Sequence, residues 1–356
     1  MPEYGKVGLV LSGGGAKGAY QVGVLNALVE LNIPVHIISG ASIGALNGAV
    51  LASAPNLTEG TSRLKEIWHE LANDSPLKHQ APSYLKLLSA AGLRESPLIA
   101  VAQSVVSVAQ HYGLPVPEKL HQAMHSGVMD DGPLKALLDK YIDHKALSDG
   151  IPFYVSVFRS AGGLLDIAIV LAAELRLLES RDSEFIHIQA KSVQERKELL
   201  LASAAIPVVF APRQVNGTIY SDGGQGGWTK AQGNTPISPL VDAGCDIVIV
   251  THLSDGSLWS RPDFPDTTIV EIRPQSRIAR GDGVLGGVKD LLGFDESKIT
   301  SWIEQGYQDT KHCIGQILQA GTARKHLKES EQALVGSEKG NAHADEALND
   351  ALSRLS

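Results

Sequence analysis

The chain has 356 residues, of which 43% are hydrophobic, and its formal net charge is −8 at pH 7. This length and apolar content suffice for one large α/β core with appendages, and they exclude a chain that is disordered over most of its length. Lys and Arg are scattered along the sequence, so no generalised basic face is expected. We therefore expect no nucleic acid among the partners.

The two cysteines, Cys245 and Cys313, form neither a C-x-x-C pair nor a cluster with histidines. We therefore expect no disulfide framework and no metal site. We also expect no cofactor. The segment from Met1 to Lys6 lacks the basic stretch and long apolar core of a secretory signal, which predicts a cytoplasmic protein. Residues 31–58 contain no charged side chain, but Pro, Gly and Asn interrupt them, so a buried strand, turn and helix explains this run better than a membrane span.

The N-terminal part alternates short apolar runs with longer helical patterns. Val22, Leu25 and Leu28 recur at helical spacing within the first of these helices. The strands expected here are residues 6–12 and 34–39, and the helices are 19–31, 43–53 and 64–72.

Residues 75–130 contain helical fragments and few strand signals. We interpret this segment as a helical insertion or lid. Its apolar stretch from Leu98 to Ala109 has two interpretations: a cap over an acyl-chain groove or a bilayer contact, and an ordinary helix packed on the core.

A second alternation of elements follows the insertion. Pro133, preceded by Asp130 and Asp131, marks the start of a helix. The later elements expected are a helix over 193–204 and strands over 152–158, 185–189, 208–210, 217–220, 246–251 and 267–272. Strands that alternate with helices predict an α/β fold: a mostly parallel central sheet with helices on both faces, in three α/β/α layers.

The C-terminal part becomes helical after Ser297 and then strongly polar. We predict a main domain over residues 5–320 with a helical C-terminal extension. Residues 321–356 mix both charge signs with few large apolar side chains, which is typical of a polar tail that is helical or partly disordered.

A glycine-rich turn from Ser12 to Gly18 follows the first expected strand. Without Cβ atoms its backbone N–H groups can turn toward an anion, helped by the start of the next helix. The turn also fits the G-x-G-x-x-G pattern of dinucleotide-binding folds. That fold needs an acidic residue about twenty positions on, and none stands between Glu30 and Glu59. An oxyanion-binding turn is therefore favoured over a nucleotide site.

The second glycine motif is Gly40 to Gly44, with Ser42 at its centre. It follows an expected strand and precedes a helix, the context in which a sharp turn exposes a serine hydroxyl. The same turn directs the next N–H group, that of Ile43, at an oxyanion. Ser42 is therefore a candidate nucleophile for acyl transfer.

A serine nucleophile needs a base, and two candidates follow in the chain. Asp222 comes directly after a strand and precedes two glycines, whereas His252 ends the apolar run from Ile247. The order of Ser42, Asp222 and His252 is that of an α/β-hydrolase triad, but the glycine turn precedes the nucleophile by only one strand, which that fold does not share. The choice of base stays open on these grounds.

The chain resembles the patatin-like phospholipases, notably their bacterial branch. The resemblance rests on the glycine turn, the serine motif and the Asp-Gly-Gly at 222–224, and it spans about residues 6–253. Further similarity lies at residues 202–207 and 234–236, with weaker similarity at residues 304–307.

The resemblance implies a catalytic dyad, with Ser42 as nucleophile and Asp222 as base, and His252 without a role. It implies hydrolysis of a carboxylic ester in a glycerophospholipid without calcium or another metal. The expected partners are this lipid substrate and, through peripheral contact, a membrane. The candidate oxyanion donors are Gly13, Gly14, Gly15, Ala16 and Ile43, and the supporting motif residues are Lys17, Gly18, Gly40, Gly44, Gly223 and Gly224. The alternatives are a thioesterase or acyltransferase that uses the same serine, and a nucleotide- or lipid-binding regulatory protein without hydrolysis.

Overall fold

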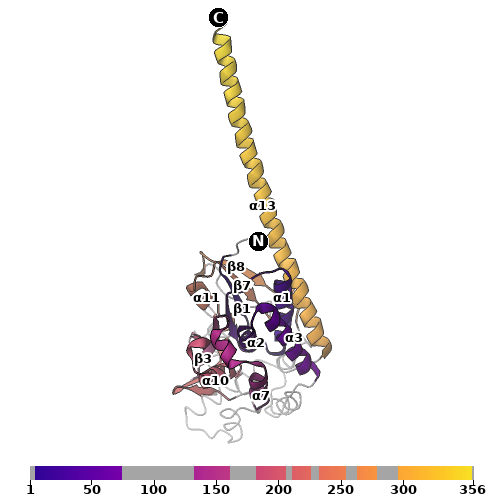
Figure 1. Ribbon diagram of the computed structural model, residues 1–356, viewed down its shortest axis with the longest axis vertical. Helices are drawn as coiled ribbons and strands as arrows, with labels where there is room; N and C mark the ends of the chain where they lie inside the picture. The colour runs from indigo at the N-terminus through magenta and orange to yellow at the C-terminus, as the bar shows by residue number, and fades with distance from the viewer. Residues whose placement is uncertain are drawn as a thin grey trace, which may run out of the picture. The chain divides into compact units, whose positions relative to one another are not determined.

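The computed structural model describes residues 5–73, 132–160, 182–205, 211–225, 232–253, 263–278 and 296–354. The chain divides into two compact units, Met1–Thr310 and Lys311–Ser356. The first unit is an α/β domain built on one β-sheet, and the second consists of the later residues of one long helix, α13 (Figure 1).

One mixed sheet of eight strands organises the first unit. Its main path runs β5-β6-β3-β2-β1-β7-β8, and β4 pairs with β3 beside that path. The four pairings from β3 through β2, β1 and β7 to β8 are parallel, and the pairings β3–β4, β3–β6 and β5–β6 are antiparallel. The strands are β1 (Val7–Leu11), β2 (Ile37–Ala41), β3 (Phe153–Arg159), β4 (Glu184–His187), β5 (Arg213–Val215), β6 (Thr218–Asp222), β7 (Ile247–Thr251) and β8 (Thr268–Ile272).

Helices cover both faces of this sheet. Figure 1 shows α11 on one side of β1, β7 and β8, with α1, α2 and α3 on the other. Leu240 of α11 belongs to one buried cluster with Val10 of β1 and Val248 of β7. The helices of the first unit are α1 (Ala19–Glu30), α2 (Ile43–Ala52), α3 (Leu57–Asn73), α7 (Gly132–Tyr141), α8 (His144–Asp149), α10 (Val193–Ser203), α11 (Ser238–Asp242) and the start of α13 (Glu296–Ser353).

The structure confirms the expected α/β class with a mostly parallel sheet. The charge-free run from residue 31 forms β2, a tight turn and α2, with all five residues of β2 buried. No helix within the described ranges is long and apolar enough to span a bilayer. The strand expected at 208–210 and the insertion expected at 75–130 lie outside the described residues. The short elements β5, α8 and α11 were not predicted, because none of them contains an apolar run or a helical repeat long enough to indicate its type.

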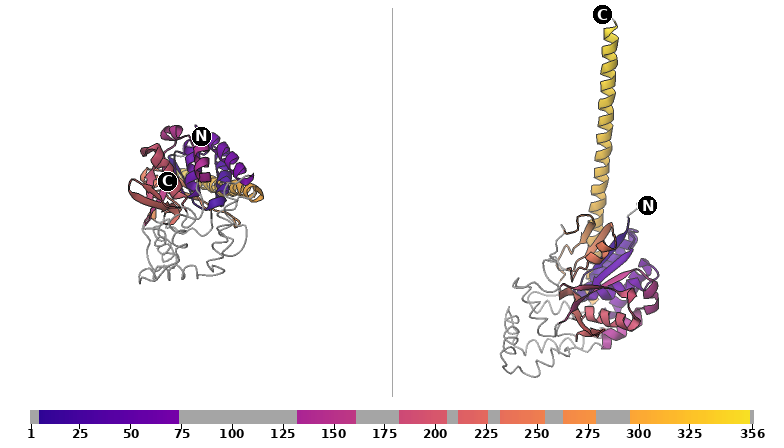
Figure 2. Two further views of the ribbon diagram at one scale, coloured as in Figure 1. Left: turned by 90° about the horizontal axis from the view of Figure 1, so that it is seen from below. Right: turned by 90° about the vertical axis from the view of Figure 1, so that its left-hand side faces the viewer.

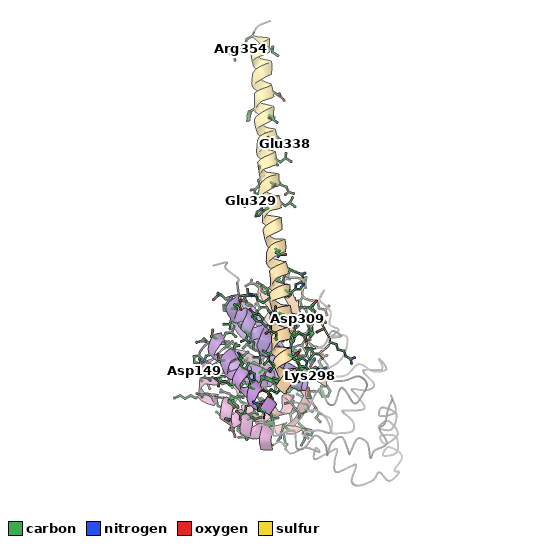
Figure 3. All side chains as sticks on the ribbon, turned by 90° about the vertical axis from the view of Figure 1, so that its right-hand side faces the viewer. Asp149, Lys298, Asp309, Glu329, Glu338 and Arg354 are labelled. Atoms are coloured by element: carbon green, nitrogen blue, oxygen red, sulfur yellow. The ribbon has the colours of Figure 1, made fainter. Side chains whose placement is uncertain are left out.

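Two glycines let α1 and the first turns of α13 approach to backbone contact. A Cβ on Gly23 would stand 1.8 Å from the Ile303 carbonyl oxygen, and one on Gly306 would stand 2.0 Å from the Tyr20 carbonyl oxygen. The Tyr20 hydroxyl also donates to the Asp309 carboxylate at 3.0 Å, and Asp309 is labelled on α13 in Figure 3. The helix-to-helix seam in the first unit therefore depends on the absence of side chains at two positions.

Beyond Thr310, α13 runs as one continuous helix to Ser353. Among its described side chains, Leu327 and Leu334 are exposed. Figure 2 shows this helix in yellow and orange from two further directions. The division expected at residue 320 falls inside this helix and stays a prediction.

We expect Gly23→Ala to destabilise the first unit by about 1–3 kcal/mol, because the added methyl group meets backbone atoms that cannot rotate away. Gly315→Ala is the matched control, since a Cβ there meets no atom within 4 Å. That substitution should stabilise helix α13 by about 0.5–1 kcal/mol. Urea unfolding of both variants measures the difference, and equal unfolding midpoints would contradict the close packing of α1 on α13.

Candidate active site

Ser42 occupies a sharp turn between β2 and α2. Its backbone has φ +52° and ψ −123°, a region that residues with a Cβ rarely adopt. Such a conformation costs about 1–3 kcal/mol and persists only where the surroundings impose it. The Ser42 side chain is 7% exposed. The serine predicted as nucleophile therefore lies on a strained turn and is largely buried.

The two glycines of the serine motif permit this turn because backbone passes close to both. A Cβ on Gly40 would stand 2.4 Å from the Gly44 carbonyl oxygen, and one on Gly44 would stand 2.1 Å from the Leu11 carbonyl oxygen. The start of α2 is thereby packed directly against the end of β1. The G-x-S-x-G spacing follows from this packing.

Asp222 ends β6 and lies beside Ser42. Its carboxylate accepts a hydrogen bond from the Gly224 backbone N–H at 2.7 Å and another from the Ser42 side chain. Burial raises the pKa of Asp222 to about 6, against the opposing effect of these two hydrogen bonds. Gly223 and Gly224 begin the short turn η3 (Gly223–Gln225) that supplies the N–H group.

The glycine-rich turn places several N–H groups at the same edge of the sheet. Gly15 has φ +58° and begins the short helix η1 (Gly15–Gly18), which also holds Lys17. The Gly13 N–H already donates to the Asn234 side-chain oxygen at 3.1 Å. The remaining candidate donors have no acceptor for their backbone N–H groups among the described residues. They are Gly14, Gly15, Ala16 and Ile43.

A buried set of amide side chains ties the glycine turn to the helix that follows Ser42. The Gln21 amide donates to the Ser12 carbonyl oxygen at 2.8 Å, and the Asn47 amide donates to the Gln21 side-chain oxygen at 2.8 Å. Asn47 also donates to the Gly18 carbonyl oxygen at 3.2 Å and accepts from the Trp68 indole at 3.1 Å. These hydrogen bonds fix the position of the glycine turn relative to α2.

Sequence reasoning assigned no role to Asn234, Ser203 and Ser156. Asn234 and Ser203 lie in two segments that carried the family resemblance, and that was the available signal. Asn234 orients Gly13, while Ser203 accepts from the Ser42 N–H at 2.9 Å and donates to the Ser156 carbonyl oxygen at 2.7 Å.

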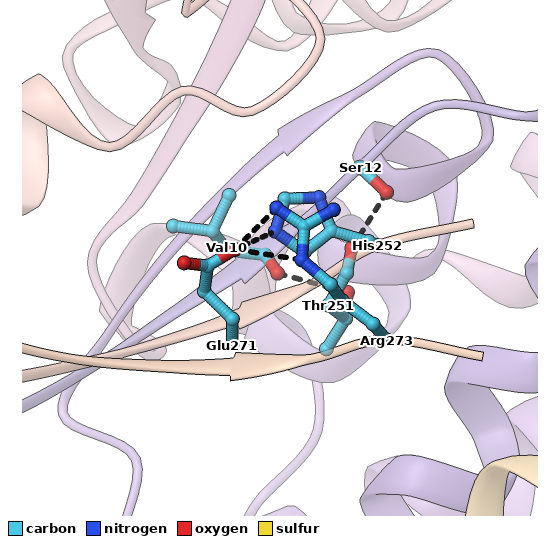
Figure 4. Close-up of polar contacts among 6 residues, drawn as sticks. All are labelled: Val10, Ser12, Thr251, His252, Glu271 and Arg273. Carbon is cyan, nitrogen blue, oxygen red and sulfur yellow. Dashed lines mark hydrogen bonds and ion pairs between the residues drawn. The ribbon is translucent and has the colours of Figure 1, made fainter. Parts of the chain in front are cut away.

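His252 is buried in a different cluster, together with the partly exposed Glu271 and Arg273 (Figure 4). Its Nε2 lies 3.1 Å from the Glu271 carboxylate, which also accepts from Arg273. Burial lowers the pKa of His252, so the neutral ring donates from Nε2, and Nδ1 is a buried acceptor with no partner among the described residues. No hydrogen bond or ion pair in the described ranges joins the His252 side chain to Ser42 or Asp222.

The residues that the structure describes contain no group of three His, Cys, Asp or Glu side chains that could hold a metal ion.

We expect Asp222→Asn to stabilise the protein at alkaline pH. Because burial raises the pKa of Asp222 from its ordinary 3.8 to about 6, the folded state resists an ionisation that the unfolded chain undergoes. The stability contributed by this group is present below pH 3.8 and is lost as pH rises toward 6. The variant should be more stable by about 3 kcal/mol at pH 8 and by less than about 1 kcal/mol at pH 4, as measured by urea unfolding. A constant difference across this range would show that the carboxyl is not desolvated.

Comparisons with known proteins bear on this site. The family model described as patatin-like phospholipase matches residues 9–241. Neuropathy target esterase of Drosophila melanogaster is 50% identical over 60 residues, which cover 17% of this chain and 4% of that protein. Relatives thus include an insect protein, and placement in a bacterial branch stays a prediction.

Two solved bacterial structures are also similar. VipD of Legionella pneumophila is 12% identical with a TM-score of 0.40, over 88% of this chain and 67% of that chain. The type III effector ExoU is 20% identical with a TM-score of 0.35, over 87% of this chain and 53% of that chain. With a family model that matches residues 9–241, including both glycine motifs and the Asp-Gly-Gly sequence, this chain belongs to the patatin-like phospholipase family.

Proposed function

We propose that this protein hydrolyses carboxylic esters of glycerophospholipids through an acyl-serine intermediate on Ser42, with Asp222 as the base. One observation carries the proposal. The Ser42 hydroxyl donates to a buried carboxylate with a raised pKa, beside a turn in which the N–H groups of Gly14, Gly15 and Ala16 have no acceptor among the described residues. Membership of a lipid hydrolase family supports a lipid ester as substrate.

The proposed reaction has two halves. The Asp222 carboxylate accepts the hydroxyl proton as Ser42 Oγ bonds to the ester carbonyl carbon, and the carbonyl oxygen becomes an oxyanion. The bond to the glycerol oxygen then breaks, and that oxygen leaves with the proton from Asp222. Water attacks the acyl-serine, Asp222 takes its proton, and the fatty acid leaves as Ser42 Oγ recovers that proton.

Burial suits Asp222 for this role. A carboxylate of ordinary pKa is a weak base toward a hydroxyl, and a value near 6 brings it closer to the working pH. Desolvation by burial is the main cause of the raised value, and no charged side chain of the described residues contributes to it. The proposed base therefore owes its strength to its environment.

The proposed oxyanion site consists of the N–H groups of Gly14, Gly15 and Ala16, joined by that of Ile43. Gly13 is better assigned to positioning, because its N–H donates to Asn234. Preorganised donors of this kind typically contribute about 10²–10³ in turnover each. A lipid ester must reach these groups from an aggregate, so we expect peripheral contact with a membrane surface.

We expect a fluorophosphonate probe to form one adduct, on Ser42, because the probe phosphorus traps an activated serine. Ser42→Ala should abolish the adduct and lower hydrolysis of phosphatidylcholine vesicles by about 10⁶-fold. Asp222→Asn should slow both reactions by about 10²–10⁴-fold. Intact mass spectrometry and fatty acid release measure the two effects.

His252→Gln is the matched control, because glutamine can keep a donor toward Glu271. Near-normal turnover is expected of a dyad, whereas loss of turnover would support a triad. Wild-type protein that neither labels nor releases fatty acid from vesicles would contradict the proposed function.

We expect kcat/KM to rise with pH through a midpoint near 6, because only the ionised form of Asp222 accepts a proton. The rate with a soluble short-chain ester, measured between pH 4.5 and 9, gives this midpoint without the complication of vesicle surfaces. A midpoint near 4 would mean that Asp222 keeps its ordinary acidity and would count against its role as base.

A further inference from the structure

The end of α10 contacts the backbones of both proposed dyad residues. Ser203, the last residue of α10, accepts a hydrogen bond from the Ser42 N–H at 2.9 Å. Two residues later, the Ala205 carbonyl oxygen accepts one from the Asp222 N–H at 3.2 Å. One short segment thus holds the nucleophile, which precedes it by 161 residues, and the base that follows it.

The Ser203 hydroxyl stands between two strands at the point where they part. The last register pair of β2 and β3 is Ala41 with Ser156. At the next residue, the Ser42 N–H reaches Ser203 Oγ, and that hydroxyl donates onward to the Ser156 carbonyl oxygen at 2.7 Å. Because the hydroxyl proton is committed to Ser156, an oxygen lone pair is available to the Ser42 N–H.

Burial keeps solvent away from this hydroxyl. Ser203 and Ser156 are both 0% exposed, so an unpaired Ser42 N–H would have no ready access to water. The strained φ of Ser42 also needs an external contact to hold it, since neither the β2 ladder nor α2 uses its N–H.

Ser156, which accepts from Ser203, also contacts the residue that follows the proposed base. Ser156 donates from its hydroxyl to the Gly223 carbonyl oxygen at 3.1 Å, directly after Asp222. A Cβ on Gly223 would stand 2.0 Å from the Ser156 carbonyl oxygen, so the start of η3 is in close contact with β3. Ser156 and Ser203 together connect the backbones on either side of the hydrogen bond between Ser42 and Asp222.

We propose that Ser203 is a positioning residue, whose hydroxyl bridges the Ser42 N–H and the Ser156 carbonyl and so fixes the distance from the Ser42 hydroxyl to Asp222. This inference rests on the proposed function for its catalytic consequence, whereas its structural content is independent of it. Displacement of a reacting group by about 1 Å can cost about 10²-fold in rate.

The test compares Ser203→Ala with Ser221→Ala. Ser221 is the matched control: it is 2% exposed, it precedes Asp222, and its buried hydroxyl has no partner among the described residues, so the same atom is removed and no described hydrogen bond is lost. With a soluble short-chain ester, Ser203→Ala should lower kcat by about 10²-fold, with KM changed less than about twofold. Ser221→Ala should keep wild-type values of both.

A pH profile separates positioning from a loss of folded protein. The hydrogen bond from Ser42 lowers the pKa of Asp222, so a displaced Ser42 should move the activity midpoint of Ser203→Ala above that of the wild type. A variant that is only less folded would keep the wild-type midpoint. Ser203→Cys, which retains a weak acceptor of similar size, should fall between serine and alanine and serves if the alanine variant does not fold.

Amide hydrogen exchange at Ser42 tests the bridge without any turnover. Exchange of this N–H should be faster in Ser203→Ala than in the wild type and unchanged in Ser221→Ala. If Ser42→Ala and Asp222→Asn keep full activity, the proposed function fails while the exchange result still decides the bridge. Wild-type exchange at Ser42 and wild-type kcat in Ser203→Ala would overturn the assignment of Ser203.

Discussion

The left-handed backbone of Ser42 is the constraint on which the rest of the site depends. At φ +52° the chain leaves β2 and enters α2 in a single residue, which places the serine hydroxyl at the edge of the sheet. This arrangement is unfavourable for an isolated serine, so neighbouring elements must stabilise it. Gly40 and Gly44 leave room for the close backbone contacts of this turn. The hydrogen bond from the Ser42 N–H to Ser203 stabilises it further.

Electrostatics around the site follow from burial more than from charge pairs. Asp222 is raised in pKa by desolvation, and its hydrogen bonds come from a neutral backbone N–H and a neutral hydroxyl. In the cluster of His252, Glu271 and Arg273 the carboxyl pKa is shifted in the opposite direction. The hydrogen bond from His252, together with Arg273, lowers the pKa of Glu271 to about 2. One sheet thus carries a carboxyl group of raised pKa, Asp222 on β6, and a carboxyl group of lowered pKa, Glu271 on β8.

Much of the framework was predictable because its signals are local. The strands β1 and β2 are short apolar runs, and the glycine spacing around Ser42 reflects close backbone contacts within a few residues. By contrast, Asn234 and Ser203 act on residues 221 and 161 positions away, and no local pattern encodes such pairs. The raised pKa of Asp222 was likewise unpredictable, since it depends on burial by the assembled sheet.

The position of β1 sets a condition on how activity arises during synthesis. β1 is the first described strand of the chain, yet it lies inside the sheet and pairs with β7, where Val7 meets Ile247. At roughly 5–20 residues per second, a ribosome needs some tens of seconds to make the intervening segment. A nascent chain that has not reached Asp222 carries Ser42 without its proposed base. The proposed dyad therefore cannot assemble until β6, which ends at Asp222, has been synthesised and has paired with β3.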